Sequence, residues 1–176
     1  LSDGSWRTPF DPYSAAHRTN DYCEGNAWQY LWLTPQDPEG LIDLMGGEET
    51  FTQKLDSLFT ISSELDDNAS VDISGMIGQY AHGNEPSHHV AYMYSYAGKQ
   101  YKTAPIIRTI NNTLYTDQPD GLSGNEDCGQ MSAWYIFSSI GFYPVNPTNG
   151  LYVFGSPLFD EVKINLPRDK QFIIKA

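Results

Sequence analysis

Hydrophobic residues recur with the period of a helix over most of the first 144 residues. The pattern is clearest over residues 48–59, where Phe51, Leu55 and Leu58 fall on one face of a chain wound at about 3.6 residues per turn. Similar patterns predict about six helices in total. Their expected ranges are 27–33, 38–45, 48–59, 84–98, 103–114 and 129–140.

Capping residues, glycine and proline set the ends of these predicted helices. Asp37-Pro38 is a favourable pair of N-cap and first helical residue, and Gly46-Gly47 ends the helix that follows. Thr103-Ala104-Pro105 is expected to open the next-to-last helix. Residues 27–33 and 129–140 are largely apolar and carry no charge, so both segments are expected to be buried on most sides.

After Pro144 the pattern changes to short β-type runs, over residues 151–154, 162–166 and 171–176. The last run is followed by no turn and has no evident partner, as expected of a truncated segment. Residues 1–22 and 60–74 show no helical period. The sequence therefore predicts a mainly α chain, with a helical part over 1–144 and a truncated strand segment over 145–176.

Composition and charge narrow the classes of function. The formal net charge of −12 excludes binding to a phosphate backbone, which requires a basic surface, so no nucleic-acid partner is expected. No apolar run approaches the ~20 residues of a membrane span. Aromatic residues make up 14% of the chain, including 12 Tyr and 4 Trp, and such side chains suit ligands with apolar faces and polar edges, such as sugars.

Glu24 is the first candidate catalytic residue. A carboxylic acid that donates a proton near neutral pH needs a raised pKa, and desolvation against rings such as Trp28 and Trp32 would supply it. The alternative is a glutamate that only stabilises the first turn of a helix. Spacing alone leaves both interpretations open.

Asp127 is the second candidate, and Glu126 stands beside it. Both acids precede an uncharged helix, whose free N–H groups keep a carboxylate ionised, as a general base requires. Ordinary capping of that helix is the alternative. A charged pair directly before a buried helix favours carboxylates that face a cleft or an ion.

The segment from His82 to His89 is the third candidate. Neighbouring residues of a helix point about 100° apart, so His88 and His89 are not expected to chelate one metal ion together. The side-chain oxygens of Asn84 and Glu85 instead suit a hard cation such as calcium. For His82 we favour a hydrogen-bonded, partly buried ring.

The two cysteines adjoin the candidate acids, Cys23 beside Glu24 and Cys128 beside Asp127. They lie near each other if the carboxylates face one cleft. We expect two small buried thiols, because neither cysteine sits among basic groups that would activate it. A disulfide is the alternative.

Three ordered segments strongly resemble glycoside hydrolase family 92, a family of calcium-dependent exo-α-mannosidases found in bacteria such as Bacteroides. They are EGNAWQY from Glu24, GQYAHGNEPSHH from Gly78, and GNEDCGQMSAWY from Gly124, followed by SSIGFYPVNP from Ser138. The resemblance runs from about Gly4 to about Leu166. It implies part of an (α/α)6 barrel followed by a few C-terminal strands, with the N-terminal β-sandwich domain and the remainder of the barrel missing.

The resemblance also implies roles for individual residues. Glu24 corresponds to the acid that protonates the departing oxygen, and Asp127 to the base that activates water, with Glu126 nearby. Asn125 stands where some members carry an aspartate that competes for the role of base, and an asparagine cannot take that role. The expected calcium ligands are Asn84 and Glu85, and the expected substrate-binding residues are Trp28, His88, His89 and Asn125.

The resemblance implies a secreted, periplasmic or surface-exposed bacterial enzyme that removes terminal α-mannosyl residues from glycans, such as N-glycans or yeast mannan. The expected mechanism inverts the anomeric centre and is assisted by Ca²⁺. The linkage, α-1,2 or α-1,3, stays open, because Gly83 stands where α-1,2-specific members often carry an acid. The alternatives are an (α/α)6 glycosidase that acts on α-glucosides, and an inactive sugar-binding fragment.

Overall fold

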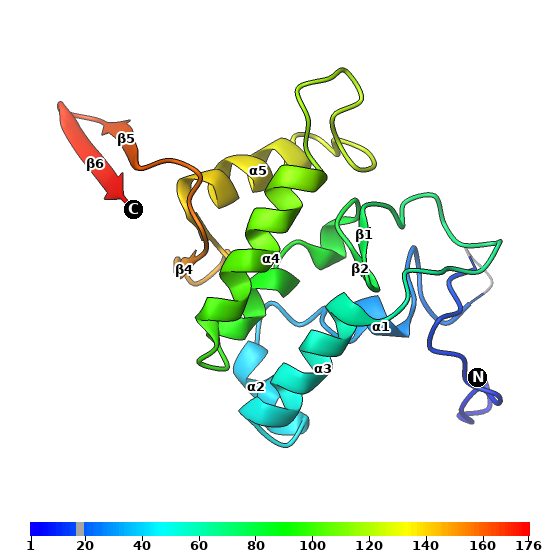
Figure 1. The fold of residues 1–176 in the computed structure, drawn as a ribbon. Helices are drawn as coiled ribbons and strands as arrows, with labels where there is room; N and C mark the ends of the chain where they lie inside the picture. The colour runs from blue at the N-terminus through cyan, green and yellow to red at the C-terminus, as the bar shows by residue number, and fades with distance from the viewer. Residues whose placement is uncertain (17–19) are drawn as a thin grey trace.

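The computed structural model describes residues 1–16 and 20–176. Its helices pack together around η2 and α4, and a C-terminal hairpin extends away from them (Figure 1). In this part of the chain the α-helices are α1 (Ala27–Tyr30), α2 (Pro38–Leu44), α3 (Glu48–Thr60), α4 (Gln100–Thr113) and α5 (Gln130–Ile140). Two 3-10 helices, η1 (Glu85–Ser87) and η2 (Val90–Ser95), lie between α3 and α4. The prediction of a mainly α chain with a few strands is confirmed.

Local signals place several helix ends as predicted. The Asp37 carboxylate accepts a hydrogen bond from the Gly40 N–H at 2.9 Å, and Pro38 occupies the first position of α2. At the other end of the chain, Gly141 closes α5 with a left-handed φ of 104°. These ends depend on side chains a few residues away, which is why the sequence alone is sufficient to predict them.

Three predicted helices differ from the structure. The helix expected over 27–33 ends at Tyr30, and the Trp32 carbonyl accepts a bond from the His89 ring instead of from a helical N–H. The segment over 84–98 forms the two 3-10 helices. The helix expected to open at 103 begins at Gln100, so Pro105 lies inside α4.

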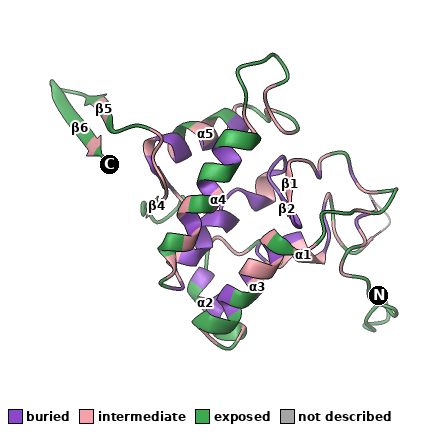
Figure 2. Ribbon diagram, viewed as in Figure 1, coloured by how far each residue is buried: buried purple, intermediate pink, exposed green. Residues whose placement is uncertain are grey.

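The core surrounds η2, whose residues 90–94 are buried completely or almost so. Trp32 packs edge-on against Phe51 of α3, with 5.4 Å between ring centroids, and Tyr92 stacks on Tyr143 at 5.0 Å. Buried residues gather where η2, α4 and α5 meet (Figure 2). This packing makes the segment that follows Asn84 and Glu85 the most enclosed part of the chain.

The expected deep burial of residues 129–140 is wrong for one side of α5. Met131, Trp134 and Ser138 are buried, but Ile136 is 58% exposed. Helix α5 packs on α4 and β3 through one face, and the helical period turns residues 132 and 136 away from these contacts. Apolar composition alone does not show which faces of a helix have a neighbour.

The strands pair as three antiparallel two-stranded sheets in the described residues: β1 (Met76–Ile77) with β2 (Tyr80–Ala81), β3 (Phe142–Tyr143) with β4 (Val153–Phe154), and β5 (Glu161–Leu166) with β6 (Lys170–Lys175). The expectation that the last run lacks a partner is wrong, since β6 pairs with β5 along its whole length. Arg168 and Asp169 form the turn with φ of 63° and 55°. In the described residues, no helix is long and apolar enough to cross a membrane.

Candidate active site

Glu24 lies in a turn directly before α1, and a buried polar network holds this turn. Asn26 caps α1, because its side chain accepts from the Gln29 N–H at 3.2 Å while the Gln29 side chain accepts from the Asn26 N–H at 2.9 Å. The Asn26 amide also donates to the Gln79 side chain at 2.8 Å, and Gln79 in turn donates to the carbonyl of Ser62 at 2.7 Å. The network ties the Glu24 turn to the β1–β2 hairpin.

The first link between the motifs is a hydrogen bond from Asn84 to Glu24. The Asn84 side-chain nitrogen donates to the backbone carbonyl of Glu24 at 2.9 Å, and Asn84 is almost fully buried. Glu24 itself has a φ of 54°, which an L-residue rarely adopts. Residues in such conformations cluster at functional sites, where the surrounding structure holds them in place.

The second link joins Glu85 to Asp127. The Glu85 carboxyl is a neighbour of the Asp127 carboxyl and acts on it electrostatically. The pKa of Asp127 is raised, first by desolvation and then by the neighbouring negative charge of Glu85. Asp127 and Cys128 also have positive φ, of 50° and 56°. The candidate acid and base thus share an unusual backbone conformation and are held by adjacent residues.

Glu126 faces α5 rather than Glu85. Its carboxylate accepts from the Ser132 N–H at 3.1 Å and from the Ser132 hydroxyl at 2.9 Å, which occupies both oxygens. The backbone carbonyl of Asp127 accepts from the Gln130 N–H at 3.1 Å. Glu126 therefore fastens the Asp127 turn to the helix, and Asp127 keeps its carboxylate outside that contact. Asn125, beside them, is exposed.

Three glycines allow the Asp127 turn to approach the Asn84 segment. A Cβ on Gly83 would lie 2.0 Å from the Ser74 hydroxyl oxygen, and a Cβ on Gly124 would lie 2.8 Å from the Gly83 carbonyl oxygen. A Cβ on Gly75 would lie 2.7 Å from Ser123. Real Cβ atoms do not come so close, so only glycine fits at these positions. The sequence did not predict this close packing, because a glycine next to polar residues indicates only a turn.

The histidines are buried and point in different directions. The Nε2 of His88 donates to the His82 carbonyl at 3.0 Å, while the Nε2 of His89 donates to the Trp32 carbonyl at 2.7 Å. Desolvation lowers the pKa of both rings, that of His88 to about 4. The Nδ1 of His88 then accepts from the Gln130 amide at 3.1 Å. Both rings are therefore neutral, and their Nε2 atoms bond to different carbonyl groups.

His82 is fully buried between two tyrosines. The Tyr115 hydroxyl donates to the Met131 carbonyl at 3.2 Å, so it accepts from the Nε2 of His82, and the Tyr80 hydroxyl donates to the Nδ1. Burial holds the pKa of His82 well below its usual range. The predicted hydrogen bonding of the ring is observed, but the ring is fully rather than partly buried.

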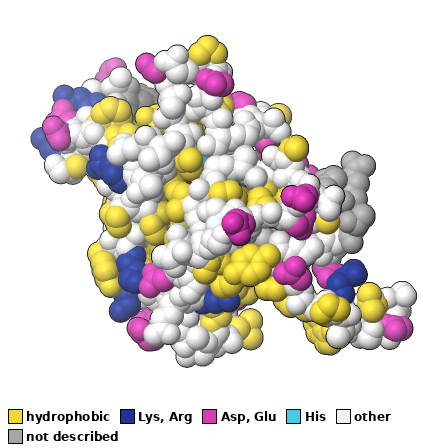
Figure 3. All heavy atoms as spheres, turned by 45° about the vertical axis from the view of Figure 1, so that its right-hand side comes forward, with side chains coloured by type: hydrophobic (Ala, Val, Ile, Leu, Met, Phe, Trp, Pro, Cys, Tyr) yellow, Lys and Arg dark blue, Asp and Glu magenta, His cyan; other side chains and the backbone are white. Residues whose placement is uncertain are grey.

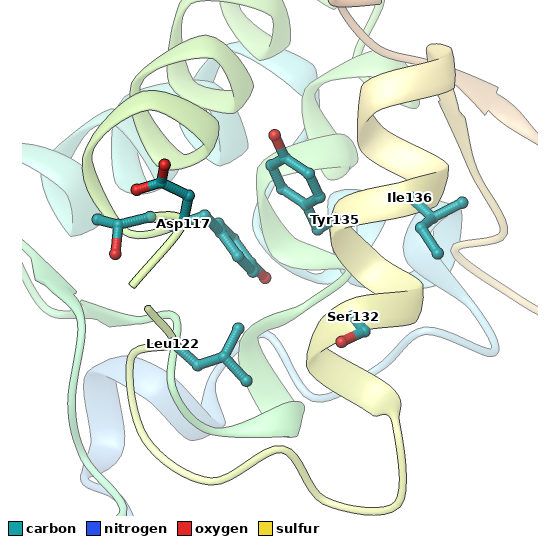
Figure 4. Close-up of a pocket in the computed structure, with 7 residues that line it drawn as sticks. Asp117, Leu122, Ser132, Tyr135 and Ile136 are labelled. Atoms are coloured by element: carbon teal, nitrogen blue, oxygen red, sulfur yellow. The ribbon is translucent and has the colours of Figure 1, made fainter. Parts of the chain in front are cut away.

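Two hollows are lined in part by candidate residues. A cavity of about 240 Å³ is lined by Glu85, His88, His89 and Gln130 among others. A pocket of about 460 Å³ is lined by Phe10, Pro12, Tyr22, Ala27, Trp28, Tyr30, Leu31 and Lys54. A third, of about 490 Å³, lies between α5 and the loop before it and contains none of the candidate residues, as the labels of Figure 4 show.

The two cysteines differ from the prediction. Cys23 and Cys128 are free and exposed, not buried, so the expectation of buried thiols is wrong. Both cysteines lie in turns of unusual backbone conformation. Glu24, which follows Cys23, has a positive φ, and so do Cys128 and its neighbour Asp127. In these turns the cysteine side chains are exposed. The small, apolar character of cysteine did not predict this exposure.

The residues present fit a calcium ion only in part. Glu85 and its neighbour Asp127 offer carboxylate oxygens, and the adjacent Asn84 carries a side-chain oxygen; oxygen is the donor that calcium prefers. Calcium takes about six to eight such ligands. In the chain outside residues 17–19, however, no group of three or more His, Cys, Asp or Glu side chains is arranged to hold a metal ion.

Two acidic residues from distant parts of the chain, Glu24 and Asp127, are thus linked to the adjacent residues Asn84 and Glu85, and glycosidases act through a pair of carboxyl groups. The whole chain, residues 1–176, matches the family described as the glycosyl hydrolase family 92 catalytic domain. The chain belongs to this family, and the predicted family is confirmed.

Solved structures of family members are similar to the chain over 99% of its length. A family 92 α-mannosidase from Bacteroides thetaiotaomicron, in complex with mannoimidazole, is 45% identical with a TM-score of 0.89. A family 92 inverting mannosidase from the same organism is 40% identical with a TM-score of 0.78. A protein described as an uncharacterized secreted glycosidase from Arthroderma benhamiae is 29% identical over 88% of the chain. The chain spans only 23%, 24% and 18% of these three proteins, respectively.

A pair of glycine variants tests how the site is assembled. Gly124 and Gly150 both have positive φ, of 90° and 70°, but only Gly124 has atoms within 4 Å of an added Cβ. Gly124→Ala should therefore lower the free energy of unfolding by about 1–3 kcal/mol more than Gly150→Ala, because the new methyl group overlaps the Gly83 carbonyl. Denaturant unfolding of the full-length protein measures this difference. Equal losses in the two variants would contradict the proposed close packing.

Proposed function

We propose that the protein to which this chain belongs hydrolyses terminal, non-reducing α-mannosyl linkages in glycans. Family membership and the two similar mannosidases support this proposal. The observation that supports it most directly is the link from two adjacent residues to the candidate acid and base: Asn84 donates to the Glu24 backbone carbonyl, and Glu85 is a neighbour of Asp127.

In the proposed mechanism, Glu24 protonates the departing glycosidic oxygen and Asp127 removes a proton from the attacking water. Glu126 is bonded to Ser132, which leaves the role of base to Asp127. In the structure without a cation, desolvation and then the charge of Glu85 raise the pKa of Asp127. Inversion requires the two carboxyl groups to stand about 6.5–9.5 Å apart, with room for water between them.

The two hollows lined in part by candidate residues are compatible with separate roles for Glu24 and Asp127. We propose that the cavity lined by Glu85, His88 and His89 takes part of the terminal mannosyl residue, because Glu85 is also a neighbour of Asp127. Both rings are neutral, so His88 and His89 would act as hydrogen-bonding groups. Asn125 stays a proposed contact, and so does Trp28 on the side of the acid.

We propose that Asn84 and Glu85 contribute ligands to a Ca²⁺ ion. The Asn84 nitrogen is engaged with the Glu24 carbonyl, which leaves the side-chain oxygen as the available ligand atom. When bound, calcium would orient sugar hydroxyls and neutralise the clustered carboxylates. Because the chain supplies only part of a ligand set, the remaining ligands would come from the glycan, from water or from the rest of the protein.

Two other functions are tested by the same assays. A panel of α-mannosides and α-glucosides separates a mannosidase from an (α/α)6 glycosidase that acts on glucosides, and the mannoside linkages in the panel resolve α-1,2 from α-1,3. An inactive sugar-binding protein would cleave none of them. We expect the isolated chain to turn over little substrate, because exposed apolar residues such as Ile136 and Phe154 lack partners that the remainder of the barrel and the β-sandwich domain would supply.

A location outside the cytoplasm is part of the proposal, since glycans with terminal mannose are found on secreted and surface material. The similar protein from Arthroderma benhamiae is described as secreted. For this protein we propose secretion, to the periplasm or to the outer surface of a bacterium.

Replacing the acid and the base tests the assigned roles. In the full-length protein, Glu24→Gln and Asp127→Asn should each lower kcat on an unactivated α-mannoside by about 10²–10⁴-fold, because each removes one proton transfer. Asp117→Asn is the matched control, since Asp117 lines the separate hollow of Figure 4 and should retain activity. Near-normal turnover by either site variant, in a folded protein, would contradict the assignment.

Removing calcium tests the metal. EDTA should abolish turnover of the full-length protein, and added Ca²⁺ should restore it, because the clustered carboxylates repel one another without a cation. Asn84→Ala should raise the Ca²⁺ concentration needed for half-maximal activity. Full activity after exhaustive chelation would contradict a role for calcium.

A further inference from the structure

A row of hydrogen bonds runs through the rings of Tyr80, His82 and Tyr115. The Tyr80 hydroxyl donates to the Nδ1 of His82 at 2.8 Å, and the Nε2 of His82 donates to the Tyr115 hydroxyl at 2.7 Å. The Tyr115 hydroxyl then donates to the backbone carbonyl of Met131 at 3.2 Å. A buried row in which every polar atom has a partner fixes the relative positions of the elements at its ends.

Aromatic packing encloses this row. His82 is fully buried, and Tyr80 is almost fully buried. Trp134 lies edge-on to His82 with 4.3 Å between ring centroids, and it is parallel to Tyr115 at 6.0 Å. On the face shown in Figure 3, hydrophobic side chains gather at the centre, whereas histidine is hardly visible. Because water does not replace a partner lost in such surroundings, each of these hydrogen bonds constrains the structure strongly.

Met131 connects the row to the turn of Asp127. Its carbonyl accepts from Tyr115, and its own N–H donates to the Glu126 carbonyl at 3.2 Å. The N–H of Gln130 donates to the Asp127 carbonyl at 3.1 Å. The first turn of α5 therefore holds the Asp127 turn through two backbone hydrogen bonds, and Tyr115 holds that first turn.

His82 belongs to the segment that carries Asn84 and Glu85. It stands two residues before Asn84, so its ring ties this segment to Tyr115 and through it to α5. Glu85 is a neighbour of Asp127. The bond between His82 and Tyr115 therefore helps to set how the segment of Glu85 and the turn of Asp127 face each other.

We propose that His82 and Tyr115, through Met131, form a brace that positions Asp127 for its reaction. The inference rests on the proposed function, in which Asp127 removes a proton from water. Neither ring lines the cavity of about 240 Å³ beside Glu85, so both are positioning residues that act through the base and do not touch the sugar. Asp127 requires such support, because its φ of 50° is unfavourable for a non-glycine residue.

Removing one hydroxyl at a time in the full-length protein tests the brace. Tyr115→Phe removes the acceptor of His82 and the donor to Met131, so it should lower kcat on an unactivated α-mannoside about 10- to 100-fold and leave KM within about twofold. Tyr80→Phe is the matched control. It takes one partner from the same imidazole but leaves the brace in place, so kcat should stay within about twofold. Equal losses of kcat would overturn the proposal, since a purely structural role affects both variants alike.

A double-mutant cycle shows whether Tyr115 acts through Asp127. All four proteins are assayed on an aryl α-mannoside with a good leaving group. In the Asp127→Asn background, Tyr115→Phe should lower kcat by less than about threefold, because the base that Tyr115 positions is already absent. A loss of the same size with and without Asp127 would contradict a positioning role.

A crystal structure of the unaltered full-length protein decides the case in which Tyr115→Phe does not fold. The Tyr115 hydroxyl should lie within hydrogen-bonding distance of both the His82 Nε2 and the Met131 carbonyl. A longer separation from either atom would overturn the brace. Failure of the unaltered, folded protein to cleave any mannoside would instead overturn the proposed function.

Discussion

The adjacent residues Asn84 and Glu85 join the turn that carries Glu24 to the turn that carries Asp127. The Asn84 side chain donates to the backbone carbonyl of Glu24, and Glu85 is a neighbour of Asp127. Consecutive Cα atoms are only about 3.8 Å apart, so two loops that are far apart in sequence are kept close together. Asn84 and Glu85 are held firmly in place, because the chain that follows them enters the buried core through η2.

This arrangement holds the candidate acid and base in strained backbone conformations. A non-glycine residue in the left-handed region costs about 1–3 kcal/mol, and Glu24, Asp127 and Cys128 all adopt it. The surrounding structure compensates through the Asn26–Gln79 network on one side and the Glu126–Ser132 bonds on the other. A strained backbone that is held by surrounding hydrogen bonds is typical of a preorganised site, because its carboxyl groups then need not rearrange during the reaction.

Features determined by near neighbours could be predicted from the sequence, and those determined by distant ones could not. Asp37 and Gly141 mark helix ends through contacts within a few residues. The exposure of Ile136 depends on which elements cover α5, and the β5–β6 pairing depends on a turn without glycine, so both were predicted wrongly. For the site, the motifs supplied the candidate residues. The Asn84–Glu24 bond and the crowding around the glycines required the fold.

The separation of the Glu24 and Asp127 carboxyl groups is the most direct test of the account. A crystal structure of the full-length protein with a mannose-like inhibitor measures it. We predict a separation of about 6.5–9.5 Å, with the inhibitor between the two groups and an ordered water beside Asp127. Carboxyl groups on opposite sides of the protein, or an inhibitor bound away from both, would contradict the proposal that the Asn84–Glu85 step assembles an inverting mannosidase site.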